Sequence, residues 1–258
     1  MPGLDPLASF RLDGRVAVVT GASAGLGARF ARVLDAAGAR VVATARRADR
    51  LASLAEDLTD ALALPCDLGA PGAAESIIAA TQERYGRVDV LVNNAGLDRT
   101  APSIDQPIDD FREVLEVNLV AAFDLTRHAA RSMIDSGNGG VIVNVASVWA
   151  LGGIGQIPNA AYAASKAGLT NLTRQLAAEW ARKGVRVNAL LPGWFRTEMT
   201  EGRMFGNDRA EAFIRRYTPM ARGGEEHELD GALLFLASDA STFVTGTTLV
   251  VDGGWSAI

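Results

Sequence analysis

The sequence has one cysteine, few lysines and no long uninterrupted apolar run. Cys66 cannot form an internal disulfide, which is consistent with a reducing compartment. Glycine, asparagine or charged residues break the apolar runs well before the roughly 20 residues that a membrane span needs. The first residues lack the basic and apolar segments of a signal peptide. We therefore expect a cytoplasmic protein without a membrane partner.

Basic residues are not in surplus, because 25 Lys and Arg against 30 Asp and Glu give a formal net charge of −5. A chain with this charge is not expected to bind nucleic acid. The two histidines, His128 and His227, lack the spacing of a zinc site, so no metal is expected. Only Lys166 and Lys183 are lysines, and every other basic residue is arginine. The position of each lysine is therefore informative.

What the sequence does have is a regular alternation of short apolar runs and amphipathic segments. The runs are continuously apolar, which is typical of strands buried on both faces of a parallel sheet. Between them lie helical patterns, such as Leu26, Phe30 and Leu34 ahead of Gly38. The alternation predicts an α/β fold with a doubly wound, seven-stranded parallel sheet and helices on both faces. The runs are residues 16–19, 40–43, 61–64, 88–92, 141–145, 185–191 and 248–251.

The chain contains no repeat or interdomain linker, so we expect one domain over residues 1–258, with residues 1–14 as an N-terminal extension. Two segments interrupt the alternation. Residues 148–160 form a loop rich in glycine and apolar side chains. Residues 194–219, called the lid segment below, are longer than a simple crossover requires. Long excursions of this kind usually cover binding sites, so the lid segment is predicted to cover the substrate.

A glycine-rich turn follows the first predicted strand and precedes an amphipathic helix. Its three glycines, Gly21, Gly25 and Gly27, permit a tight turn and a close approach of the backbone to a pyrophosphate, which the helix N-terminus attracts. The spacing is GxxxGxG, not the GxGxxG of the general dinucleotide motif. A purely structural turn is the alternative. Taken with the features below, the turn predicts a dinucleotide site.

One tyrosine stands out by elimination. Of three tyrosines, only Tyr162 is followed four positions later by a lysine, Lys166, which places both on one face of a helix. A phenol with a pKa near 10 is a poor acid or base at neutral pH. A neighbouring ammonium favours the phenolate and lowers that pKa. The alternative is a chance pair on a helix surface, and the glycine turn upstream argues against it.

These motifs together resemble the short-chain dehydrogenase/reductase family. The resemblance extends from TGASAGLG at residues 20–27, through NNAG at 93–96 and YAASK at 162–166, to VDGG at 251–254. It implies a single-domain Rossmann fold. It also implies an oxidoreductase that interconverts C=O and CH–OH groups with a nicotinamide cofactor.

The resemblance also implies roles for individual residues. Tyr162 would be the general acid or base, and Lys166 would bind the nicotinamide ribose and lower the Tyr162 pKa. Ser147 would donate a hydrogen bond to the substrate oxygen, and Asn118 would hold a water that connects Lys166 to solvent. The residues implied to bind the cofactor are Gly21, Ser23, Gly25, Leu26, Gly27, Arg46, Arg47, Asp67, Leu68, Asn93, Ala95, Gly96, Tyr162, Lys166, Pro192, Gly193, Phe195 and Thr197.

The end of the second predicted strand favours NADP(H) over NAD(H). An acidic residue there would bind the ribose 2′-hydroxyl and repel a 2′-phosphate. The chain instead has Ala45, followed by Arg46 and Arg47. Arginine binds phosphate in a bidentate manner, and Ser23 could add a hydrogen bond. NAD(H) use remains possible, since both arginines could be solvated charges at a helix start.

The sequence therefore predicts an NADP(H)-dependent oxidoreductase that interconverts a small-molecule ketone and a secondary alcohol. The alternatives are a 3-oxoacyl-thioester reductase of the fatty-acid type, an NAD-dependent sugar or polyol dehydrogenase, and a catalytically silent cofactor-binding protein. An apolar pocket wall would favour a moderately apolar or cyclic ketone over a free sugar. The residues expected in that wall are Trp149, Leu151, Ile154, Ile157, Trp194, Phe195, Met199, Met204 and Phe205.

Two predicted helices, over residues 109–136 and 162–182, carry apolar residues on more than one face. One face can cover the sheet, and the other then needs a partner. We therefore expect a homo-oligomer, and the family resemblance points to a homotetramer.

Overall fold

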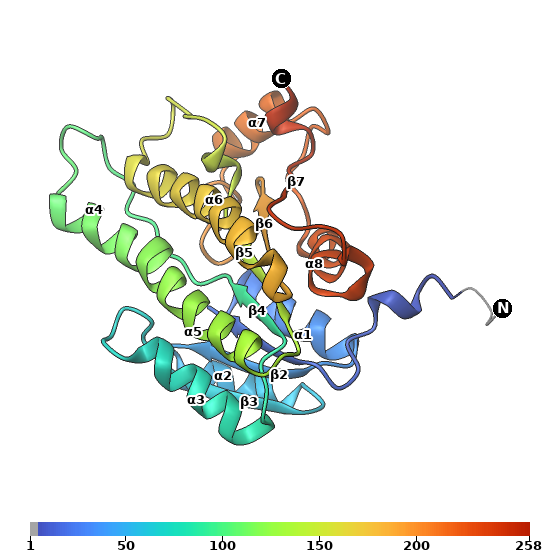
Figure 1. Cartoon of the computed structure of the whole chain (residues 1–258). Coiled ribbons are helices and arrows are strands. Elements are labelled where there is room, and N and C mark those ends of the chain that lie inside the picture. The colour runs from blue at the N-terminus through green and yellow to red at the C-terminus, as the bar shows by residue number, and fades with distance from the viewer. Residues whose placement is uncertain (1–4) are drawn as a thin grey trace.

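Seven parallel strands form the centre of the computed structural model, which describes residues 5–258. Their bounds are β1 Val16–Thr20, β2 Arg40–Ala45, β3 Ala61–Pro65, β4 Val90–Asn93, β5 Gly140–Val145, β6 Val185–Pro192 and β7 Thr248–Val251. They lie in the order β3-β2-β1-β4-β5-β6-β7 (Figure 1). Every predicted run is a strand within two residues of its expected bounds, so the doubly wound parallel sheet is confirmed.

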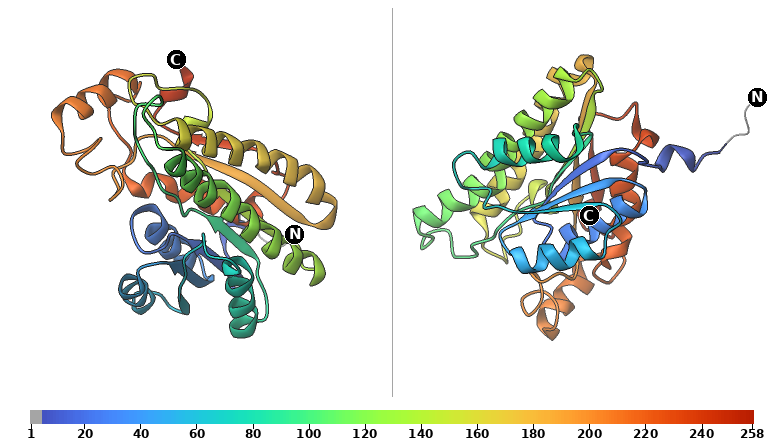
Figure 2. Two further views of the ribbon diagram at one scale, coloured as in Figure 1. Left: turned by 90° about the vertical axis from the view of Figure 1, so that its left-hand side faces the viewer. Right: turned by 90° about the horizontal axis from the view of Figure 1, so that it is seen from below.

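Helices cover both faces of this sheet (Figure 2). Their bounds are α1 Gly25–Ala36, α2 Ala48–Glu56, α3 Ala73–Tyr85, α4 Ile108–Leu115, α5 Ala121–Asp135, α6 Ala160–Trp180, α7 Asp208–Tyr217 and α8 Asp230–Ala237. Buried side chains of α1, α2 and α8 form one apolar cluster with the sheet. Those of α3, α5 and α6 form a second cluster with the opposite face.

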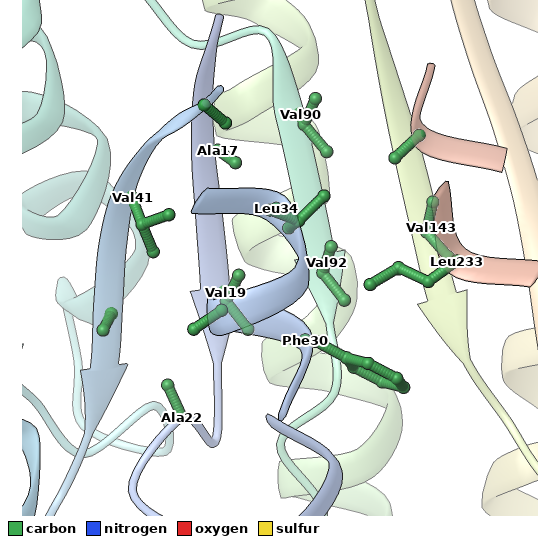
Figure 3. Packing of buried hydrophobic residues seen from close by; sticks show 14 of the residues in the cluster. Ala17, Val19, Ala22, Phe30, Leu34, Val41, Val90, Val92, Val143 and Leu233 are labelled. Atoms are coloured by element: carbon green, nitrogen blue, oxygen red, sulfur yellow. The ribbon is translucent and has the colours of Figure 1, made fainter. Parts of the chain in front are cut away.

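The strands are continuously apolar because each of their faces is covered. Ala17 and Val19 of β1 belong to the first cluster, whereas Val16 and Val18 belong to the second, and none of the four is exposed. Figure 3 shows the first cluster, in which α1 and α8 lie over β1, β4 and β5. Successive side chains of a strand thus pack alternately into the two apolar clusters.

The strand order reverses between β1 and β4, since β2 and β3 lie on one side of β1 and the later strands on the other. In open α/β sheets such a switch point leaves a crevice at the carboxyl ends of the strands, where ligands bind. The glycine turn after β1 and the NNAG segment after β4 both lie at this edge.

The helix expected over residues 109–136 is interrupted by a π-helical turn, Glu116–Val120, between α4 and α5. Asn118 lies in this turn and is fully buried. Short π-helical segments inside α-helices occur frequently at functional sites. The apolar periodicity of the sequence gave no sign of the extra residue in the turn.

The two ends of the chain and the lid segment complete the fold. Residues 1–4 of the expected extension lie outside the described residues, and Leu12 is buried against the first core. The lid segment contains α7, whose Phe213 contacts Trp255 near the C-terminus with 5.5 Å between ring centroids. Figure 1 shows α7 at the same edge of the molecule as the C-terminus. Within residues 5–258, no helix has the length and apolar character to cross a membrane.

Candidate active site

A cavity of about 730 Å³ lies at the carboxyl edge of the sheet. Its volume is in the range of about 300–1,000 Å³ that is usual for ligand pockets. Every sequence-predicted site residue except Asn93 and Asn118 lines it. Those residues are Gly21, Ser23, Gly25, Leu26, Gly27, Arg46, Arg47, Asp67, Leu68, Ala95, Gly96, Ser147, Tyr162, Lys166, Pro192, Gly193, Phe195 and Thr197.

The glycine turn forms one wall of the cavity and leaves room for an anion. A Cβ on Gly21, which has φ +66°, would lie 2.9 Å from Ala95 Cα, and one on Gly27 would overlap the Gly21 carbonyl oxygen. The N-cap of α1 is Ala24, so no side chain caps the helix. The backbone N–H groups and the positive end of the helix dipole therefore remain available. This cradle fits the pyrophosphate of a dinucleotide.

The catalytic end of the cavity, defined here by Ser147, Tyr162 and Lys166, is built by β5 and α6. Lys166 is 3% exposed, and its Nζ donates a hydrogen bond to the Val145 carbonyl at 2.8 Å. Its Nζ lies 5.6 Å from the centre of the Tyr162 ring. Burial lowers the pKa of Lys166 to about 8. A lysine with this pKa can gain and lose a proton near neutral pH.

Burial has the opposite effect on Tyr162 and raises its pKa to about 12. A hydrogen bond with Ser147 lowers this pKa, and the negative charge of Asp98 raises it. Desolvation of the phenolate is the largest of these effects, so the pKa rises despite the hydrogen bond with Ser147. In this structure Tyr162 is therefore held in its protonated form, which suits a general acid.

Asn118 lies behind the catalytic end rather than on the cavity wall. Its Oδ1 accepts a hydrogen bond from the Leu97 N–H at 2.8 Å, and its Nδ2 donates to the Leu97 carbonyl at 2.9 Å and to Ser165 Oγ at 3.0 Å. A Cβ on Gly96 would lie 3.3 Å from Asn118 Oδ1 and 3.5 Å from Lys166 Nζ. Asn118 thus ties the chain after β4 to α6, beside Lys166.

Asn93 does not lie where a cofactor contact was expected. It is buried, and its Nδ2 donates to Thr126 Oγ1 at 2.7 Å and to Asn144 Oδ1 at 2.8 Å. Those bonds connect β4 to α5 and β5. Successive side chains of a strand point to opposite faces, so the next residue, Asn94, lines the cavity instead. The assignment of Asn93 to the cofactor is therefore corrected.

The arginine end of the cavity, defined here by Ser23, Arg46 and Arg47, lies where β2 ends. Arg47 Nε donates to Ser23 Oγ at 3.1 Å, so these two predicted residues do come together. Arg46 is exposed, and no described residue forms an ion pair or hydrogen bond with its guanidinium. Asp67 also lines the cavity, and its Oδ1 accepts a hydrogen bond from the Gly69 N–H at 3.1 Å.

A charged pair near Tyr162 was not predicted from the sequence. Asp98 and Arg203 both line the cavity, and their side chains lie 3.0 Å apart. The Asp98 side chain is only 13% exposed. Asp98 directly follows the NNAG segment and Leu97, and this position was its only available signal. Arg203 comes from the lid segment, whose path the sequence does not define.

The apolar wall expected around the substrate is largely absent from the cavity. Of its nine residues, only Phe195 and Met199 line the cavity. Trp149, Trp194 and Phe205 are buried in a separate apolar cluster with Ile154, Ile157 and Met204 packed against them, and Leu151 is exposed. The aromatic residues pack against one another, and Trp194 lies edge-on to Trp255 with ring centroids 5.4 Å apart. Seven of the nine expected wall residues therefore do not line this cavity, although the cluster that holds six of them packs against Tyr162.

The described part of the chain contains no group of three His, Cys, Asp or Glu residues placed to hold a metal ion. The polar groups that line the cavity include hydroxyl, ammonium, guanidinium and carboxylate groups. These groups lie in one cavity beside a pyrophosphate cradle, which is the arrangement that the family resemblance implied.

Comparisons with known proteins agree with this arrangement. A family model described as enoyl-(acyl carrier protein) reductase matches residues 21–256. A short-chain type dehydrogenase/reductase from Mycobacterium marinum superposes with a TM-score of 0.94 at 33% identity, covering 98% of this chain and 100% of the other. The chain belongs to the short-chain dehydrogenase/reductase family. It is therefore an oxidoreductase that acts on CH–OH and C=O groups, and several of its relatives are named dehydrogenases.

Two further members of the short-chain dehydrogenase/reductase family are similar over almost their whole length. Galactitol 2-dehydrogenase (L-tagatose-forming) from Cereibacter sphaeroides is 42% identical over 252 residues, which are 96% of this chain and 97% of that protein. A gluconate 5-dehydrogenase from Burkholderia cenocepacia, solved in complex with NADP and tartrate, is 37% identical. It has a TM-score of 0.92 and covers 98% of this chain and 100% of its own.

Proposed function

We propose that the protein is an NADP(H)-dependent oxidoreductase that interconverts a secondary alcohol and a ketone on a polyhydroxylated small molecule. The observation that carries the proposal is the joint placement of Tyr162, Ser147 and Lys166 at one end of a cavity whose other end holds Arg46 and Arg47. Burying a lysine beside Tyr162 at the catalytic end is unfavourable, and a protein without catalytic activity would gain nothing from it.

In the reductive direction, Ser147 and Tyr162 would both donate hydrogen bonds to the substrate carbonyl oxygen. Tyr162 then transfers its proton to that oxygen as negative charge develops, and Ser147 stabilises the charge. When bound, NADPH supplies the hydride for the carbonyl carbon. Lys166, with its pKa near 8, returns a proton to Tyr162 after each turnover. Asn118 fixes the chain after β4 against α6 and so keeps Lys166 in place.

The charged lining near Tyr162 supports a polyhydroxylated substrate. Asp98 can accept hydrogen bonds from substrate hydroxyl groups and Arg203 can donate them, whereas an apolar ketone would use neither group. Relatives named for galactitol and gluconate point in the same direction. We therefore prefer this substrate class to the cyclic or apolar ketone expected from the sequence.

Cofactor choice is the second part of the proposal. Arg46 and Arg47 at the end of β2 and Ser23 in the glycine turn supply donors for a 2′-phosphate. NADP is named in the solved structures of several relatives. An NAD-dependent polyol dehydrogenase is the competing assignment, since most relatives' names do not state the cofactor.

Steady-state kinetics would test both parts. We expect oxidation of polyols or aldonates with NADP⁺, with a higher kcat/KM than with NAD⁺, and reduction of the matching ketoses or ketoacids with NADPH. Cyclohexanone and acetoacetyl-thioesters serve as the comparison arms, the latter because the matching family model is described as an acyl-carrier-protein reductase. A higher kcat/KM on a thioester or an apolar ketone than on any polyol would overturn the substrate class.

We also infer that the protein assembles as a homotetramer. Ile108, Val120 and Phe123 lie along α4, the π-helical turn and α5, and they are 60%, 47% and 40% exposed. Exposed apolar side chains along neighbouring helical segments favour association. Light scattering during gel filtration should give four times the 27.1 kDa chain mass. A monomer at micromolar concentration would refute the assembly without affecting the proposed chemistry.

A further inference from the structure

A carboxylate of the lid segment contacts Arg47, at the arginine end of the cavity, and Arg50 of α2 just outside the cavity lining. Glu198 Oε2 is 3.0 Å from Arg47 Nη1 and 3.1 Å from Arg50 Nη1. Glu198 directly follows Thr197 after β6, whereas both arginines lie where β2 leads into α2. The contact therefore joins two segments about 150 residues apart in the chain, across the mouth of the cavity.

Arg47 has a second contact on the same side of the cavity. Its Nε donates to Ser23 Oγ at 3.1 Å, while its Nη1 is shared between the two Glu198 oxygens. Arg46 has no such partner among residues 5–258. The arginine end thus contains one available guanidinium, Arg46, and one, Arg47, that already shares a carboxylate with Arg50 of α2.

A carboxylate and a phosphate use the same guanidinium donors. Both accept parallel N–H bonds from arginine, and a phosphate offers more acceptor oxygens and more negative charge. Arg47 and Arg50 lower the pKa of Glu198, so its carboxylate is ionised at neutral pH. A phosphate in the cavity that binds Arg47 Nη1 must therefore displace Glu198 from that atom.

We propose that Glu198 is a specificity-determining residue that competes, within the chain, with the cofactor 2′-phosphate for Arg47, the one of its two arginine partners that lines the cavity. The inference rests on the proposed use of NADP(H) at this end of the cavity. NADH has no 2′-phosphate and can bind with Glu198 in place. Glu198 therefore weakens the binding of NADPH but not that of NADH. It thereby lowers the preference of the enzyme for NADPH over NADH.

The size of the effect follows from exposure. The Arg47, Arg50 and Glu198 side chains are 42%, 47% and 52% exposed, so solvent weakens each pair. Removing the carboxylate should tighten NADPH binding by roughly twofold to tenfold, the range that one or two exposed ion pairs supply. The gain should shrink at high ionic strength, because salt screens exposed charges.

The test is a fluorescence titration of the substrate-free protein with NADPH and with NADH. It compares the wild type, Glu198→Gln and Glu56→Gln. Glu56 is exposed near the end of the same α2 helix and does not line the cavity, so its substitution controls for net charge. Thermal melting checks that each variant is folded. We expect a lower Kd for NADPH in Glu198→Gln, where the Kd for NADH should change less, and unchanged Kd values for both cofactors in Glu56→Gln.

Each outcome decides the inference. An unchanged or higher Kd for NADPH in Glu198→Gln would overturn it, since Glu198 would then be a bystander or would orient the arginines. An equal change for both cofactors, or the same change in Glu56→Gln, would reduce it to general electrostatics. The proposed function is judged separately, by whether the wild type binds NADPH more tightly than NADH.

Discussion

The two cationic ends of the cavity differ in burial, and the difference explains which basic residue each one uses. Lys166 is almost fully buried, bonds to a carbonyl and has no carboxylate partner among the described residues. Arg47 and Arg50 are about half exposed and share Glu198. Burial lowers the pKa of a lysine into the working range, whereas a guanidinium stays protonated. The buried cation can move a proton, and the exposed cations can only bind an anion.

This contrast explains why one of the few lysines of the chain lies at the buried end of the cavity. The chain uses arginine at nearly every basic position but retains lysine at position 166. Lys183, the other lysine, lies in an exposed turn before β6. The pair therefore offers a matched comparison between a site that needs proton transfer and one that needs only a surface charge.

The strongest test of the contrast replaces the buried lysine by arginine. We expect Lys166→Arg to lower kcat by about 10²–10⁴-fold, the usual contribution of acid–base catalysis. Arginine cannot release a proton, and its fork does not fit the space beside Val145 and Tyr162. The control Lys183→Arg should have wild-type kinetics. If folded Lys166→Arg turned over near the wild-type rate in steady state, Lys166 would not be needed for proton transfer.

At the exposed end, the expected change concerns binding rather than turnover. Arg46→Ala should lower kcat/KM with NADPH by about 10–100-fold, because a charge-assisted hydrogen bond to phosphate contributes roughly 1.5–3 kcal/mol. Kinetics with NADH in the same variant are the internal control and should change little. Equal losses with both cofactors would show that Arg46 supports the local fold and does not recognise the 2′-phosphate.

The buried lysine should also cost stability. Its pKa falls from 10.5 to about 8 on folding, so the folded state binds the proton less tightly than the unfolded state. The resulting penalty is complete below pH 8, shrinks between pH 8 and pH 10.5, and is absent above. Lys166→Met, which removes the charge, should therefore raise the free energy of unfolding by about 1–3 kcal/mol at pH 7. Urea unfolding at pH 7 and pH 10 should show a smaller gain at pH 10, whereas equal gains would indicate better packing alone.

Sequence reasoning succeeded where a signal is local. The strands were predicted within two residues because burial on both faces gives unbroken apolar runs. Tyr162 and Lys166 were predicted to adjoin because one helical turn separates them. Arg47 and Ser23 follow neighbouring strands of the sheet, so they meet at one edge.

The failures share a different cause. Asn93 was assigned to the cofactor because the sequence does not tell which face of β4 a polar residue meets. The apolar wall, the Asp98–Arg203 pair and the Glu198 contact all depend on the path of the lid segment. That path follows from aromatic packing among distant residues, including Trp194 and Trp255, and the periodicity of the sequence does not predict it.

The smallest expected effect connects the lid segment to the buried end. The Asp98 charge raises the pKa of Tyr162, and Arg203 partly neutralises that charge. Alcohol oxidation needs the deprotonated phenol, so below its pKa the rate follows the phenolate fraction. Asp98→Asn should lower the pKa of Tyr162 and shift the rising limb of log kcat against pH to lower pH by less than about one unit. Arg203→Gln should shift the same limb to higher pH, because it leaves Asp98 fully charged beside Tyr162. Shifts in the same direction for both variants would show that the pair positions the substrate and does not tune the acid.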